Sequence, residues 1–90
     1  MNLALPGTEL VEQGLADLHA RRETVASLLV SIASKRLAAT GCDVAEPFTD
    51  PEHRLYALLG RDDQDAAHGR YNALLRQLSS YARAAECVAP

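Results

Sequence analysis

The residues of this chain best suited to chemistry lie in its C-terminal part. A helix predicted over residues 62–87 carries polar side chains opposite its apolar stripe, namely Asn72, Arg76, Ser79, Ser80 and Arg83. Amide, hydroxyl and guanidinium groups can contact phosphates and base edges. The helix is also locally basic, because residues 66–85 contain three Arg and no acid, whereas residues 43–65 contain seven acids and two Arg. The pattern indicates binding to nucleic acid, and the alternative is an ordinary solvated helix face.

A second basic group lies earlier in the chain and contains Arg21, Arg22, Lys35 and Arg36, which a dimer would display twice. The net charge of -3 argues against indiscriminate binding to nucleic acid or acidic membrane, so any DNA contact must come from a local face. A helix-turn-helix around Gly60 fits poorly, because the acids that follow would face phosphates. The residues predicted to bind DNA are Asn72, Arg76, Ser80, Arg83, Arg21 and Lys35.

Metal and catalytic sites are not indicated. The three histidines, His19, His53 and His68, show no i, i+4 pairing with one another or with cysteine. Cys42 and Cys87 lie 45 residues apart, which fits neither a zinc site nor a thioredoxin-type pair. We therefore expect reduced thiols, no metal, no cofactor and no catalytic residues, although a bridge is possible if the ends of two helices meet.

The first half of the chain has the spacing of a coiled-coil seam, with steps of four and three residues. The seam consists of Val11, Leu15, Leu18, Arg22, Val25, Leu29, Ile32 and Arg36. With Thr8 as N-cap and Gly41 as stop, one helix over residues 8–40 would be roughly 48 Å long at ~1.5 Å per residue, with Gly14 allowing it to bend or fray. A compact chain of this length makes a globule only about 31 Å across. The seam is therefore predicted to be the interface of a homodimer.

Two further helices are predicted, over residues 50–59 and 62–87. Thr49 and Glu52 have the spacing of a capping box, or Asp50 caps with Pro51 at the first helical position, and Gly60 ends the helix. Its apolar side consists of Leu55, Leu58 and Leu59. The apolar stripe of the last helix consists of Ala67, Tyr71, Leu74, Leu75, Leu78, Tyr81, Ala82 and Ala85.

The composition favours a single all-α domain over residues 1–90. Apolar residues make up 48% of the chain but aromatic residues only 4%, and no segment alternates in the manner of a strand. We expect an antiparallel helical hairpin, built from two long helices and a short bridging helix, that dimerises into a bundle. No apolar run reaches the ~18 residues of a membrane span, and no secretion signal is recognisable, so we expect a cytoplasmic protein that does not contact membrane.

These features predict a small non-enzymatic dimeric regulatory or interaction protein, and specifically a DNA-binding transcriptional regulator of bacterial type. The alternative is a protein-binding adaptor or a partner subunit of a helical complex.

A further alternative is an enzyme with an inward Arg pocket. In this interpretation the chain resembles the all-helical chorismate mutases in its length, in its inward cations and in a long first helix shared by a dimer. The residues that would correspond are Arg22, Lys35, Asp50 and Arg54. The spacing from Lys35 to Asp50 is longer than in that family, and no Arg precedes Arg21.

Overall fold

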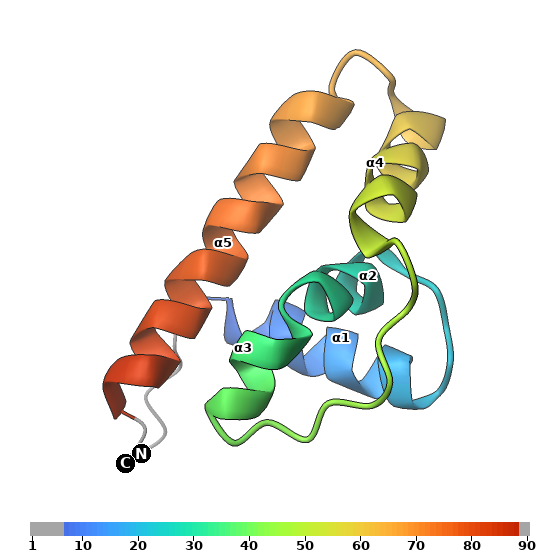
Figure 1. The fold of residues 1–90 in the computed structure, drawn as a ribbon. Helices are drawn as coiled ribbons and strands as arrows, with labels where there is room; N and C mark the ends of the chain where they lie inside the picture. The colour runs from blue at the N-terminus through green and yellow to red at the C-terminus, as the bar shows by residue number, and fades with distance from the viewer. Residues whose placement is uncertain (1–6, 89–90) are drawn as a thin grey trace.

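The computed structural model describes residues 7–88 of the chain. Its helices are α1 (Thr8–His19), α2 (Val25–Ile32), α3 (Ser34–Ala39), α4 (Pro51–Asp62) and α5 (Ala67–Val88), and residues 7–88 contain no strand. The predicted all-helical fold class is therefore confirmed. The central helix is α2, which packs against α1 and α4, while α5 runs along one edge of the molecule (Figure 1). None of the described helices is long and apolar enough to cross a bilayer.

The single helix predicted over residues 8–40 is wrong, because the chain breaks at residues 20–24 and again at Ala33. At the first break Arg21 has a left-handed φ of 59°. Thr24 then begins α2 with a reciprocal capping box: its hydroxyl accepts from the Ser27 amide at 3.1 Å, and the Ser27 hydroxyl accepts from the Thr24 amide at 2.8 Å. These local hydrogen bonds compete with a continuous helix and end it.

Gly14 allows α1 and α2 to pack at very short range. A Cβ atom at this position would lie 2.4 Å from the Ala26 carbonyl oxygen and 2.4 Å from Val30 Cγ2. The glycine expected to fray or bend one long helix is instead the point where two helices meet. Because the chain folds back here, the molecule measures 40 × 24 × 21 Å with a radius of gyration of 12.8 Å. One chain thus accommodates the segment without a helix of ~48 Å.

The seam predicted to bind a second copy lies largely inside the monomer. Its apolar members are buried or half-buried against the rest of the same chain: Val11, Leu15, Leu18, Val25, Leu29 and Ile32. Its two cations, Arg22 and Arg36, are exposed and pair with acids of their own chain. The homodimer was predicted because one long helix would not fit inside a single compact chain. The observed short helices remove that reason, and dimerisation stays a prediction.

Buried polar groups join the first two helices and fix the connector between α3 and α4. The Asp17 carboxylate, 5% exposed, accepts from Gln13 Nε2 at 3.0 Å and from the Thr24 hydroxyl at 2.8 Å. The buried Ser31 hydroxyl accepts from the Phe48 amide at 3.1 Å. In the described part of the chain no buried side-chain nitrogen or oxygen lacks a hydrogen-bond partner. The polar interior is therefore fully satisfied, as a stable core requires.

The last two helices differ from their predicted bounds of 50–59 and 62–87. The expected capping of α4 by a side chain is wrong, because Asp50 has a left-handed φ of 50° and neither candidate makes a cap hydrogen bond. Pro51 does occupy the first turn, but Gly60 does not end the helix, which continues to Asp62. The helix α5 begins only at Ala67, since the Asp63 carboxylate accepts from the amides of Asp65 and Ala66 and forms a turn before it.

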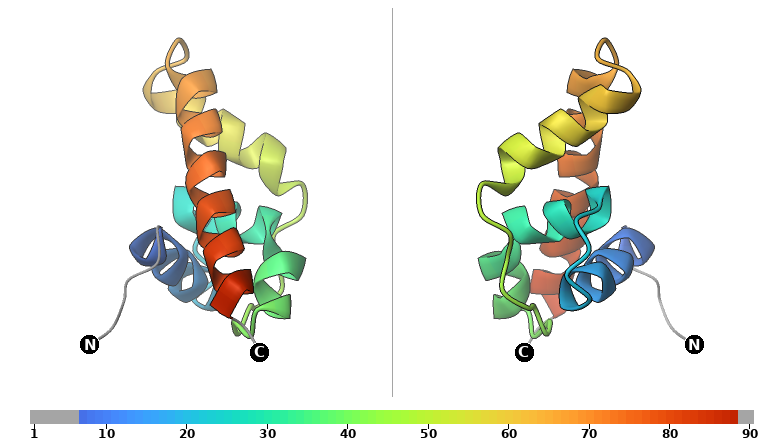
Figure 2. Two further views of the ribbon diagram at one scale, coloured as in Figure 1. Left: turned by 90° about the vertical axis from the view of Figure 1, so that its left-hand side faces the viewer. Right: turned by 90° about the vertical axis from the view of Figure 1, so that its right-hand side faces the viewer.

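The apolar sides of these two helices are as predicted. The α4 leucines at positions 55, 58 and 59 and the eight residues of the α5 stripe are all buried or half-buried. Among the described residues no other helix covers the opposite side of α5, as the left-hand view of Figure 2 shows. This leaves a long helical face open to solvent.

Candidate binding face on α3 and α5

The outer face of α5 brings together the polar residues singled out in its sequence. They line a shallow groove of about 390 Å³ whose residues are Asn72, Leu75, Arg76, Ser79, Ser80 and Arg83. Arg76 and Arg83 are exposed and stand seven residues apart, which is ~10 Å along a helix axis. Asn72 is less free, because its amide donates to His68 Nε2 at 3.2 Å.

A second groove of about 430 Å³ adjoins the first and lies between α3 and α5. It is lined by Ile32, Ala33, Ser34, Lys35, Arg36, Leu75, Leu78, Ser79 and Ala82. Leu75 and Ser79 line both grooves, so the two form one continuous surface. Its floor is apolar, and its rim carries hydroxyls and cations.

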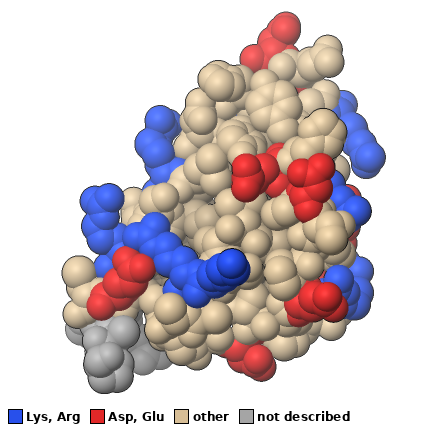
Figure 3. All heavy atoms as spheres, in the orientation of Figure 1, with Lys and Arg blue, Asp and Glu red and all other residues tan. Residues whose placement is uncertain are grey.

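The charge of this surface is opposite to that of the whole chain. The residues lining the two grooves include four cations and no acid, and we call Lys35, Arg36, Arg76 and Arg83, with the grooves between them, the basic face. The chain as a whole has nine Lys and Arg against twelve Asp and Glu. Cations gather over α3 and the lower half of α5 in the space-filling view (Figure 3). Such segregation produces a local positive potential despite a negative net charge.

One acid borders the basic face and already occupies part of it. Glu86 of α5 accepts two hydrogen bonds from Arg36 of α3, from Nε to Oε2 and from Nη2 to Oε1, both at 2.9 Å. The pKa of Glu86 is lowered by these hydrogen bonds and by the charges of Arg36 and Arg83, and the pKa of Arg36 is raised by the same contact. The side chains remain 41% and 44% exposed. Arg36 therefore presents a bidentate carboxylate site at the surface.

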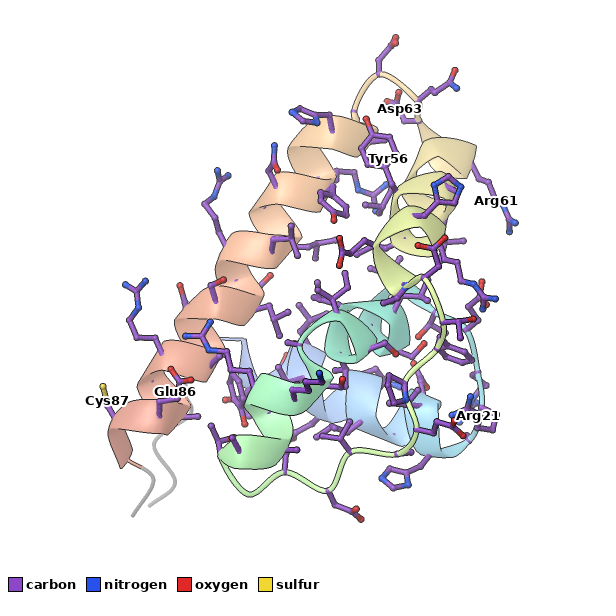
Figure 4. The ribbon with its side chains drawn as sticks, in the orientation of Figure 1. Arg21, Tyr56, Arg61, Asp63, Glu86 and Cys87 are labelled. Carbon is purple, nitrogen blue, oxygen red and sulfur yellow. The ribbon has the colours of Figure 1, made fainter. Side chains whose placement is uncertain are left out.

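The second basic group predicted from the sequence does not form a cluster. Arg21 lies on the other side of the molecule from Glu86 (Figure 4), where it donates to the Glu46 carbonyl oxygen at 2.6 Å and lies 4.7 Å from the centre of the Phe48 ring. Arg22 pairs with Asp17 at 3.7 Å. Only Lys35 and Arg36 of that group contribute to the basic face. Arg21 therefore does not share a surface with Lys35 and Arg36, and a role for it in DNA binding stays a prediction.

The cations considered for an inward pocket are also at the surface. Arg22 and Lys35 are exposed, and Arg54 donates to Glu23 Oε1 at 2.9 Å and to the Thr49 hydroxyl at 3.4 Å. Asp50 is exposed at the start of α4. These four residues do not converge on a common cavity.

None of the residues that line the two grooves is a histidine or a cysteine. His19 contacts the Asp43 carbonyl oxygen at 2.9 Å, and His68 lies 6.5 Å from Tyr56 between ring centres. Tyr56 also meets Tyr71 edge to face at 5.6 Å. Cys42 and Cys87 are free thiols. Within residues 7–88 no group of three His, Cys, Asp or Glu side chains could hold a metal ion.

The apolar floor of the basic face was not foreseen from the sequence. Ile32 was assigned to the dimer seam, and Leu75 to the buried stripe of the last helix, yet both are only half-buried and line a groove. A usable signal was present, because Leu75 directly precedes Arg76 at the border between the apolar and polar sides of α5.

In comparisons with known proteins, no family model, no curated protein and no solved structure matches this chain. The feature of the molecule that bears on its function is therefore the basic face, with its cations beside half-buried apolar side chains.

Proposed function

We propose that the chain is a non-enzymatic interaction protein that binds a partner protein through the basic face. The observation that carries this proposal is the presence of apolar and cationic side chains on one concave surface. Leu75 and Ile32 line the groove and are only half-buried, so a partner can desolvate them, and cations line the rim. Protein interfaces commonly combine such an apolar centre with a polar rim, and complementary charge sets their orientation.

DNA-binding regulation is the second candidate. It is favoured by Arg76 and Arg83 on one open face of α5, next to Ser80. We rank it second for three reasons. Phosphate contacts make no use of an apolar floor, Asn72 is engaged with His68, and Arg21 and Arg22 interact with their own chain instead of extending the basic face.

The protein-binding proposal is tested by reversing one rim charge. The full chain, tagged, is purified from its native cells as wild type, as Arg83→Glu and as Arg61→Glu, a matched charge change on α4. We expect a partner that is recovered with the wild type and with Arg61→Glu but reduced by about ten-fold with Arg83→Glu, which corresponds to ~1.4 kcal/mol of binding. Equal recovery with all three proteins would remove the basic face from the interaction.

The DNA candidate has its own test. If Arg76 and Arg83 contact phosphates, replacing both by Ala lowers the slope of log affinity against log salt by about two per protomer. Wild-type binding to DNA from upstream of its own gene that is weaker than a Kd of roughly 10⁻⁴ M at physiological salt would exclude this candidate.

A further inference from the structure

The geometry points to the occupant of the α3–α5 groove: an amphipathic helix of the partner protein with acidic residues beside its apolar stripe. We propose in addition that Glu86 stands in for one of the partner's carboxylates on Arg36 while the groove is empty. The inference rests on the proposed function and specifies the chemistry of the partner.

The floor of the groove has the spacing that helix packing requires. Leu75, Leu78 and Ala82 line it at steps of three and four residues on α5, and Ile32 and Ala33 line it from the α2–α3 junction. Leu78 and Ala82 are buried in the core, so the apolar part that an occupant can reach consists of Leu75, Ile32 and Ala33. A row of this kind accepts the apolar ridge of another helix. The groove is partly open to solvent, whereas typical ligand pockets bury most of a small molecule's surface, so an elongated occupant that also reaches the rim fits it better.

The rim selects acidic neighbours for that apolar ridge. Lys35 and Arg36 stand on the α3 side of the groove, while Arg83 stands on the α5 side in the adjoining groove. No acid is among the residues that line either groove. A helix laid between them with Asp or Glu on both flanks would find a cation on each side, whereas a basic helix would be repelled.

The Arg36–Glu86 pair demonstrates the contact that a partner carboxylate would make. Its two hydrogen bonds of 2.9 Å have the fork geometry in which a guanidinium holds a carboxylate. Both side chains are solvated, and exposed ion pairs contribute little to stability. A partner's Glu can therefore displace Glu86 with little loss to the fold, and Glu86 lowers the affinity for acidic helices by competing with them.

Nucleic acid and a second copy of this chain fit the groove less well. DNA offers phosphates to the rim but no apolar ridge to the floor. In a second copy, the exposed acids of α1 are Glu9 and Glu12, and that face carries no exposed large apolar side chain. Tyr56 is the exposed large hydrophobic residue of the described part, and a single ring cannot cover a floor of several side chains.

The inference is tested by selecting binders from a displayed peptide library. The peptides have about 20 residues with apolar positions at helical spacing and all other positions random, and the full chain is the bait. We expect the enriched peptides to carry Asp and Glu beside the apolar stripe and to become helical on binding. Affinity should fall by about ten-fold for Ser79→Tyr, which fills the groove from an exposed position, and for Arg83→Glu, but by less than about two-fold for Arg61→Glu.

The role of Glu86 is tested with the same peptides. Glu86→Gln should raise their affinity by about three-fold, because Arg36 is released from its internal carboxylate, whereas Glu9→Gln should leave it unchanged. If Glu86 only braces α3 against α5, Glu86→Gln would instead lower thermal stability and leave affinity unchanged or reduced, and that part of the inference would be wrong.

The outcomes separate this inference from the proposed function. The inference is overturned if the selected peptides show no acidic enrichment, or if acidic peptides still bind Ser79→Tyr. The proposed function would still stand if a natural partner is recovered with the wild type and lost with Arg83→Glu. Duplex DNA that binds the basic face more tightly than every selected peptide would overturn both. A dimer that dissociates with Arg83→Glu would assign the groove to a second copy.

Discussion

Gly14 shows how a single missing side chain sets the distance between two helices. A methyl group there would meet the backbone of Ala26 and the side chain of Val30 at 2.4 Å, well inside van der Waals contact. A Cβ atom at Gly69 of α5 would instead have no atom within 4 Å apart from its own stretch of the helix backbone. The two glycines therefore separate the effect of close packing from the intrinsic cost of glycine in a helix.

Gly14→Ala should lower the free energy of unfolding by about 1–2 kcal/mol, because overpacking typically costs ~1–3 kcal/mol and exceeds the gain of up to ~1 kcal/mol in helix propensity. Gly69→Ala should instead raise it by about 0.5–1 kcal/mol. Urea unfolding followed by circular dichroism measures both. If the two substitutions have the same sign, close approach at Gly14 is not limiting.

The carboxylate of Glu86 reports on its contact with Arg36. Since the folded-state pKa of Glu86 lies below its ordinary value of 4.5, the pair stabilises the fold above the unfolded pKa, and this contribution is lost as the pH falls through the folded pKa. NMR titration of the Glu86 carboxyl should show its midpoint moving up towards 4.5 in Arg36→Gln. A midpoint that does not move would show that the pair is not formed in solution.

The break between α1 and α2 is the feature of the elements that departs most from the sequence prediction. Helix type, the two apolar faces of α4 and α5 and the open face of α5 were all predictable, because each follows from local periodicity. The break was not, since the apolar spacing continues through residues 18–29 and the capping signal at Thr24 uses Ser27 in place of the usual Glu or Gln. The Arg36–Glu86 contact joins residues 50 apart and has no local signal at all.

Thr24 is predicted to hold this break in place. Thr24→Ala should cost about 1–2 kcal/mol of stability, because it removes the N-cap of α2 and a donor to the buried Asp17 carboxylate. Thr24→Ser keeps both hydrogen bonds and should stay within about 0.5 kcal/mol of the wild type. Chemical denaturation of the three proteins measures the difference. Equal stability of the Ala and Ser variants would argue that packing alone ends α1.

At the scale of the whole molecule, the chain buries most of its apolar seam within one copy and leaves its charges segregated. Leu29 is fully buried in the monomer and belongs to the same core cluster as Leu28 and Leu55. One surface of the described residues that remains for association is the basic face, which has half-buried apolar residues beside cations. Any homodimer therefore has to form without the central part of the seam.

Leu29→Asp distinguishes a monomer core from a dimer interface. The structure predicts strong destabilisation of the monomer, because a buried unpaired carboxylate in place of Leu costs at least about 3 kcal/mol out of a typical total of ~5–15 kcal/mol. Circular dichroism and sedimentation equilibrium of the purified variant measure this. A well-folded monomer of the variant, obtained from a dimeric wild type, would instead place Leu29 at an interface.

Site-specific photo-crosslinking shows whether a partner protein binds the basic face. A photoreactive amino acid is placed at Ser79, which lines both grooves, or at Ala57, an exposed position on α4, and the full chain is irradiated in its native cells. We predict a discrete covalent adduct with one protein from position 79 and none of that mass from position 57. If position 79 gives no protein adduct, or if both positions give the same adducts, then no partner protein binds specifically at the basic face.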